Sequence, residues 1–166
     1  MTESAYPLAA LVSGLALMAI LAAIVIVDFR RLVIPDLLNL ALAGSGLLLQ
    51  LVTDPDRVPF QVAFAFVTLA LFWCIRQGYV TMTGRIGLGL GDVKMFGAAA
   101  LWISPLLFPV LIFIASAAAL LFVAGQAIAR GSTAARSRVP FGPFIALGLA
   151  TTWSVQYFVG SSLEML

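Results

Sequence analysis

The chain is distinctive first for what it has little of, namely histidine, cysteine and charge. Its 166 residues contain no histidine, which excludes histidine-based acid–base catalysis and histidine ligation of a metal. The single cysteine, Cys74, can form neither an intrachain disulfide nor a cysteine-type zinc site, and its apolar surroundings favour a packing role. Charged residues make up only 10% of the chain, compared with roughly a quarter in soluble domains. This composition excludes an ordinary soluble domain.

Hydrophobic residues account for 63% of the chain, and the mean hydropathy is +1.13. We therefore predict an all-α, polytopic membrane protein, a helix bundle in the lipid bilayer with residues 1–166 forming a single domain. A membrane-spanning helix needs roughly 20 apolar residues. The apolar runs cover residues 8–27, 34–52, 60–75, 95–129 and 139–159.

The run 95–129 is interrupted by Ser104, Pro105 and Pro109, so it can be one long helix or two short ones. Residues 1–7 carry no basic residue, unlike a cleaved signal peptide, so we expect residues 8–27 to be a retained span with its amino end outside. Two helices in 95–129 then place every Lys and Arg except Arg57 on the cytoplasmic side. We therefore predict about six transmembrane helices with both termini outside.

The chain has only seven acidic residues, and two of them lie at the edges of predicted spans. Asp28 follows the first span, and Asp92 precedes the fourth, both on the predicted cytoplasmic side. Charge is costly in hydrocarbon, so such acids indicate a functional site. Two carboxylates brought together share a proton, and such a pair can hydrolyse a peptide bond. The pairing requires the first and fourth spans to pack against each other, which the small residues Ala22, Ala23, Gly97, Ala98 and Ala99 favour.

The residues around the two acids also have physical roles. Alternate positions before Asp92 are glycine, which clears side chains from the approach to its carboxylate: Gly87, Gly89 and Gly91. Pro35 breaks a regular helix near Asp36, so we expect residues 28–36 to form a bent connection at the membrane surface. Lys94 can act electrostatically on the acid pair or anchor the fourth span at the headgroups.

Less specific interpretations exist for each feature. An Asp followed by two Arg is often only the flank of a membrane span, and a glycine-rich stretch can bind phosphate only in a strand–loop–helix context that this sequence lacks. No nucleic-acid partner is expected. Two other functions remain open: a small proton-coupled transporter, since membrane acids also form proton relays, and a non-catalytic scaffold of a secretion apparatus.

Taken together, the motifs resemble those of the type IV prepilin peptidases, which are GxGD-type intramembrane aspartic proteases. The resemblance covers nearly the whole chain in order. It rests on Asp28, on Ile34-Pro35-Asp36 with Asn39, on Gly89-Leu90-Gly91-Asp92-Val93-Lys94, and on Pro140-Phe141-Gly142-Pro143 at the start of the last span.

The resemblance implies that Asp28 and Asp92 are the catalytic aspartates of an endopeptidase. It implies supporting roles for Pro35, Asp36, Asn39, Gly89, Gly91 and Lys94, and a structural or substrate-contacting role for Pro140, Phe141, Gly142 and Pro143.

The family removes the leader from prepilins and pseudopilins at the cytoplasmic face of the inner membrane, and its peptidase chemistry uses no metal or cofactor. Many bacterial members carry an extra amino-terminal region with paired cysteines, which is associated with N-methyltransferase activity. This chain looks like the short form, similar to tight-adherence (Flp) prepilin peptidases, so we expect no methyltransferase activity.

Overall fold

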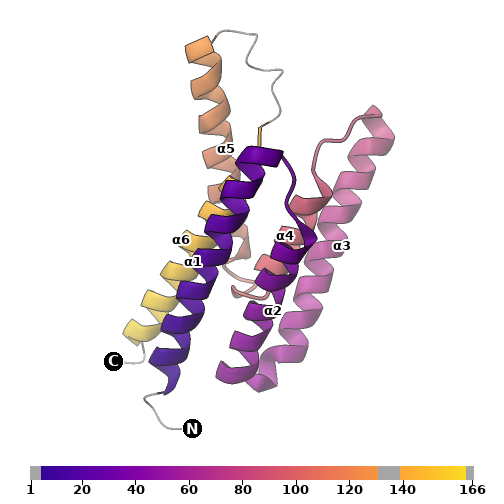
Figure 1. Cartoon of the computed structure of the whole chain (residues 1–166). Helices are drawn as coiled ribbons and strands as arrows, with labels where there is room; N and C mark the ends of the chain where they lie inside the picture. The colour runs from indigo at the N-terminus through magenta and orange to yellow at the C-terminus, as the bar shows by residue number, and fades with distance from the viewer. Residues whose placement is uncertain (1–4, 131–138, 164–166) are drawn as a thin grey trace.

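The computed structural model describes residues 5–130 and 139–163 of the chain. Its described part contains helices and turns but no strand (Figure 1). The elements are α1 (Ala5–Arg31), α2 (Asp36–Thr53), the 3-10 helix η1 (Pro55–Arg57), α3 (Val58–Thr83), α4 (Leu90–Ala99), α5 (Phe108–Arg130) and α6 (Gly142–Leu163). The prediction of an all-helical bundle is confirmed.

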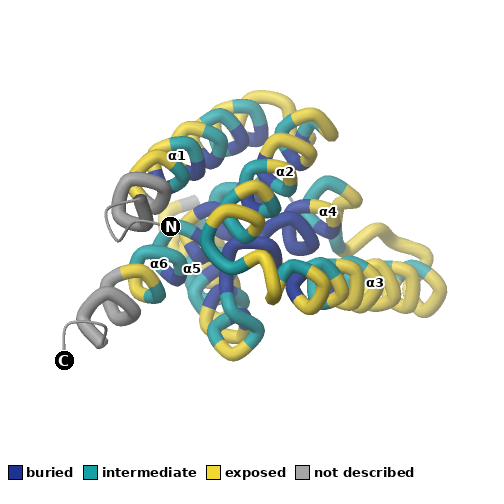
Figure 2. The backbone as a smooth tube through the Cα atoms, turned by 90° about the horizontal axis from the view of Figure 1, so that it is seen from below, coloured by how far each residue is buried: buried dark blue, intermediate teal, exposed yellow. Residues whose placement is uncertain are grey.

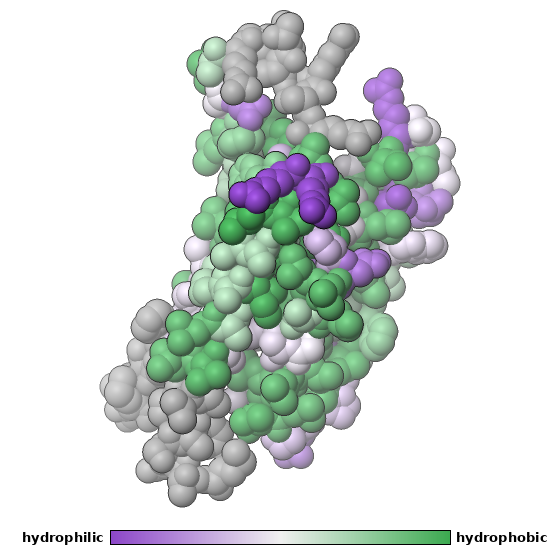
Figure 3. Space-filling model, in the orientation of Figure 1, coloured by the Kyte–Doolittle hydropathy of each residue, from purple (hydrophilic) through white to green (hydrophobic). Residues whose placement is uncertain are grey.

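Four helices are long and apolar enough to cross a membrane, namely α1, α2, α3 and α5. Large hydrophobic side chains on their outer faces are exposed, as expected for surface that contacts lipid. Figure 3 shows hydrophobic surface over the middle of one face and the most hydrophilic side chains at its upper end. The chain is thus a multi-pass membrane protein, whereas the number of six crossings and the outside location of both termini stay predictions.

The interruption of the run 95–129 has the predicted form. Helix α4 ends at Ala99 and α5 begins at Phe108, so the run contains two helices and not one. Helix α4 has only 10 residues and is about 15 Å long, half the thickness of the hydrocarbon core. Residues 100–107 continue from it as a series of turns.

Two predicted boundaries were wrong. Helix α3 extends to Thr83 and not to residue 75, because residues 76–83 contain no proline and only one glycine, and the helix ends where Gly84 adopts a left-handed conformation (φ 68°). Helix α1 extends to Arg31, so Asp28 lies inside its last turn and not in a bent connection. The chain leaves the helix only at Leu32 (φ 53°) and re-enters α2 after Pro35.

The packing of the helices also differs from the prediction. We expected the first and fourth spans to pack against each other, but α1 packs on α2 and α6, while α4 packs on α2, α3 and α6 (Figure 2). Among the described residues, α1 and α4 make no direct packing contact. The reason is visible at Gly97, where an added Cβ would meet the Leu69 side chain of α3 at 3.1 Å, so the small residues of α4 accommodate α3. Helices α2 and α6 therefore connect the elements that carry the two acids.

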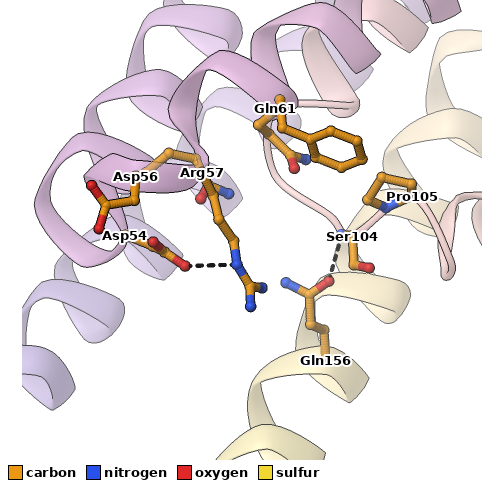
Figure 4. A pocket seen from close by; sticks show the side chains of 9 residues that line it. Asp54, Asp56, Arg57, Gln61, Ser104, Pro105 and Gln156 are labelled. Atoms are coloured by element: carbon orange, nitrogen blue, oxygen red, sulfur yellow. Dashed lines mark hydrogen bonds and ion pairs between the residues drawn. The ribbon is translucent and has the colours of Figure 1, made fainter.

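Side-chain amides surround the turns that follow α4. The Gln61 amide donates hydrogen bonds to the carbonyls of Ala100 (2.6 Å) and Ile103 (2.7 Å). The Gln50 amide donates to Leu101, and the Gln156 carbonyl accepts the Ser104 N–H. We call Gln50, Gln61 and Gln156 the glutamine clamp; it borders a cleft of about 440 Å³ beside η1 (Figure 4). The clamp lets a non-helical backbone lie deep in an apolar bundle, where unpaired carbonyls are costly.

Candidate active site

The Asp28 carboxylate lies at the start of α6. Its side chain is buried, with an exposed fraction of 4%, and its Oδ2 accepts the backbone N–H of Gly142 at 3.0 Å. The amino end of a helix carries unpaired N–H groups and a partial positive charge, and both stabilise an anion. A Cβ at position 142 would lie 2.7 Å from Oδ2 of Asp28, so only glycine allows this approach. Within the Pro140–Pro143 motif, Gly142 is thus the residue that contacts Asp28.

The Asp92 carboxylate lies in the first turn of α4, and its side chain is half-buried. The pKa of Asp92 is raised to about 6. Burial is the largest cause, the negative charge of Asp28 adds to it, and a hydrogen bond with the Gly89 backbone opposes the shift. A Cβ at Gly89 would lie 2.8 Å from Oδ2 of Asp92. The structure therefore brings the two acids near enough for the charge of one to act on the other.

Ile34 fills the space between the glycines of the two motifs. A Cβ at Gly91 would lie 3.1 Å from the Ile34 Cβ, and a Cβ at Gly142 would lie 3.0 Å from the Ile34 Cδ1. The side chain of Ile34 is itself buried, with an exposed fraction of 5%. The short connection between α1 and α2 thereby packs against the start of both α4 and α6, which explains how two acids on non-contacting helices come together.

Asn39 and Lys94 join α2 to the segment around Asp92. Asn39 Nδ2 donates a hydrogen bond to the Gly91 carbonyl at 3.1 Å, and the Asn39 side chain is buried. Lys94 Nζ lies 2.6 Å from Oδ1 of Asp36 in an exposed ion pair. This pair links α4 to α2, which is neither of the two roles considered for Lys94, and those two roles stay predictions. Pro35 precedes α2, and its carbonyl accepts the N–H groups of Leu38 and Asn39.

The remaining residues of the last motif shape the start of α6. The Phe141 carbonyl accepts the N–H groups of Phe144 and Ile145, and its ring lies 6.3 Å from the ring of Phe96 on α4. Pro140 precedes α6 and Pro143 lies in its first turn, where a missing N–H costs no helical hydrogen bond. These contacts orient the N–H of Gly142 without reaching the acids themselves.

Sequence reasoning missed a contact that holds the glycine-rich segment. Arg76 Nε donates to the Leu88 carbonyl at 3.1 Å, and Gly87 packs closely against the Tyr79 ring. Both partners lie on the part of α3 that was expected to be a loop, so no local signal indicated them. Among the described residues, no group of three or more acidic or cysteine side chains is placed to hold a metal ion.

The fold and site together define a class, a polytopic helical membrane protein with two neighbouring carboxylates at one end of the bundle. Residues 15–124 match the type IV leader peptidase family. The leader peptidases HopD of Escherichia coli and Salmonella typhimurium are 32% and 34% identical to this chain, over 76% and 78% of it and 82% and 84% of their own lengths. The chain therefore belongs to the type IV leader peptidase family, and it is a membrane-embedded peptidase.

A larger relative matches over part of its length. The prepilin leader peptidase/N-methyltransferase of Aeromonas salmonicida is 27% identical over 85% of this chain, and the chain spans about half (49%) of that protein. No solved structure matches the chain.

Proposed function

We propose that Asp28 and Asp92 are the catalytic pair of an aspartic endopeptidase that removes the leader from prepilin or pseudopilin precursors. The observation that supports this most is the pairing itself. Asp28 is buried against the amino end of α6, and its charge acts on Asp92, which lies on a different helix. Two acids in this arrangement are costly in a membrane protein and are suited to share one proton.

The surroundings of the two acids suggest different roles for them. The Gly142 N–H and the positive end of α6 favour the ionised form of Asp28, and we assign it the role of general base on this ground. Asp92, with a pKa of about 6, is the group that more readily holds a proton near neutral pH. In the proposed reaction, Asp28 takes a proton from water while Asp92 donates a hydrogen bond to the peptide carbonyl. The water oxygen adds to the carbonyl carbon, and collapse of this intermediate passes a proton to the leaving amine.

The distribution of basic residues supports a cytoplasmic active site in the inner membrane. Arg30 and Arg31 follow Asp28 within one turn, and Lys94 follows Asp92, whereas Arg57 lies in the turn between α2 and α3. The positive-inside rule assigns the end that carries the acids to the cytoplasm. We further propose that residues 1–166 act as one peptidase domain without methyltransferase activity, consistent with the lack of paired cysteines.

A cleavage assay in membranes tests the proposed pair. A tagged precursor whose basic leader ends in glycine is expressed with the wild type, Asp28→Asn or Asp92→Asn, and the size shift is followed. Each replacement keeps the side-chain volume and removes the ionisable group, so we expect cleavage to fall at least about 10³-fold. Asp36→Asn serves as the control, because Asp36 is exposed and paired with Lys94, and it should retain most activity. Substantial cleavage by Asp92→Asn would contradict the assignment, and loss in Asp36→Asn would then point to Asp36.

A further inference from the structure

A groove opens toward the lipid between α2 and α3. Its walls are apolar side chains of these helices, and residues of α4 form its floor. Helix α4 packs against both α2 and α3 (Figure 2). The cavity measures about 670 Å³, within the range of roughly 300–1,000 Å³ typical of ligand clefts. The lining includes Leu40 and Ala43 of α2, Ala65 and Phe66 of α3, and Gly97 and Ala98 of α4.

One end of this groove is polar and lies next to the segment that carries Asp92. Asp36, Asn39 and Lys94 line that end. Asn39 is bonded to the Gly91 carbonyl, one residue before Asp92. A ligand that fills the groove therefore ends beside the segment that carries the acid.

Asn39 supplies a second, independent indication of a ligand. Its side chain has an exposed fraction of 5%, and its Oδ1 has no hydrogen-bond partner among the described residues. The amide orientation follows from the Gly91 carbonyl, which can accept only from Nδ2. A buried acceptor without a partner is unfavourable in an apolar environment. The groove is thus lined by a residue whose buried acceptor has no donor within the described part of the chain.

We propose that this groove binds the apolar helical segment of the precursor, which enters sideways from the lipid, and that Asn39 Oδ1 accepts a backbone N–H where this segment approaches the acids. This inference rests on the proposed function. The apolar walls match a hydrophobic helix, and the free acceptor matches the unpaired N–H groups at a helix amino end. A lipid acyl chain fills the same space but has no donor for Asn39.

Cross-linking tests the location of the precursor without requiring turnover. Phe66 and Val67 are adjacent on α3 and similarly exposed (67% and 63%), but only Phe66 lines the groove. In an Asp92→Asn, Cys74→Ser background, Phe66→Cys or Val67→Cys is combined with a precursor that carries single cysteines along its apolar segment. We expect disulfide cross-links at position 66 that exceed those at position 67 by about tenfold or more. Equal cross-linking at both positions would overturn the proposal.

Filling the groove provides a functional test. Ala43 is partly buried and lines the groove, whereas Ala41 is exposed and does not line it, so Ala43→Trp and Ala41→Trp add the same volume inside and outside the groove. We expect Ala43→Trp to lower kcat/KM at least about tenfold, mainly through KM, and Ala41→Trp to stay within about twofold of the wild type. Equal rates for both would mean that lipid occupies the groove, while the proposed function would stand. If the wild type cleaves no precursor, the proposed function itself fails. If Ala43→Trp does not fold, the cross-linking pair decides.

Discussion

Two regions of this bundle bury polar groups in an apolar setting, and they differ in the charge and the hydrogen-bond pairing of those groups. Around residues 100–107, the glutamine clamp pairs the carbonyls that the end of α4 leaves free. Around Asp28 and Asp92, the charge of one carboxylate acts on the other, and the Oδ1 of Asn39 has no partner among the described residues. The amides of the clamp are neutral and satisfied, whereas the groups near the acids are charged or incompletely paired.

The difference separates a structural polar cluster from a functional one. Neutral groups that are paired by hydrogen bonds allow the backbone to leave the helical form at little cost in free energy. Such paired groups give no indication of a ligand. Carboxylates held near each other at a membrane edge are unfavourable for stability, so their presence indicates chemistry. Changes at the clamp should therefore alter stability, and changes near the acids should alter activity. The predictions below test this division.

Among the changes that leave both acids in place, Gly142→Ala should have the largest effect. The added Cβ would lie 2.7 Å from Oδ2 of Asp28, so the carboxylate or α6 must shift. A displacement on the order of 1 Å in an active site can reduce the rate about 100-fold, and we expect a loss of this size in kcat for precursor cleavage. Gly78→Ala is the matched control, because a Cβ there has open space around it. Full activity in Gly142→Ala would remove Asp28 from its proposed place in the site.

Gln61→Leu alters the glutamine clamp, so it should lower stability and leave activity unchanged. It removes the donor to the carbonyls of Ala100 and Ile103, and we expect the free energy of unfolding to fall by about 1–3 kcal/mol. The folded fraction should cleave the precursor at the wild-type rate. Unfolding in detergent with a denaturant measures the first quantity, and a rate normalised to folded protein measures the second. Gln77→Leu on the exposed face of α3 is the control and should change stability by less than about 0.5 kcal/mol.

The comparison of the two regions also explains how much the sequence could predict. The positions of Asp28 and Asp92 at the ends of apolar runs, and the break at Ser104 and Pro105, were accessible because local composition decides them. The length of α3 was missed because Arg76 and Gln77 look like loop residues, although nothing before Gly84 ends the helix.

Long-range contacts were beyond sequence patterns. The bond from Gly142 to Asp28 joins positions 114 residues apart, and the motif around Gly142 gives no hint that its N–H is the group that matters. The same holds for the glutamine clamp, because the sequence of an apolar helix does not indicate to which carbonyl its glutamine donates. The packing of α4 on α3 and not on α1 was mispredicted for this reason, since small residues permit close approach without specifying the partner.

The pH dependence of cleavage should distinguish the two regions further. If Asp92 must hold a proton, activity is high below its pKa of about 6 and falls about tenfold per pH unit above it. The glutamine amides do not ionise in this range, so Gln61→Leu should leave the profile unchanged. Because the charge of Asp28 raises the pKa of Asp92, Asp28→Asn should lower that pKa, which NMR of labelled Asp92 can measure. A profile that is flat from pH 5 to 8 would contradict the proposed role of Asp92.

The ion pair between Lys94 and Asp36 should have the smallest effect, although Lys94 lies only two residues after Asp92. Its side chains are exposed (45% and 76%), so water and salt screen the attraction, and such pairs contribute at most about 1 kcal/mol. The part-buried bond from Asn39 to Gly91 makes the same connection between α2 and α4 with less exposure to water. We therefore expect Lys94→Met and Asp36→Asn to change the free energy of unfolding little, and a double-mutant cycle to give a coupling that disappears at high salt. A coupling of several kcal/mol that persists in salt would mean that this pair, and not Asn39, holds the Asp92 segment against α2.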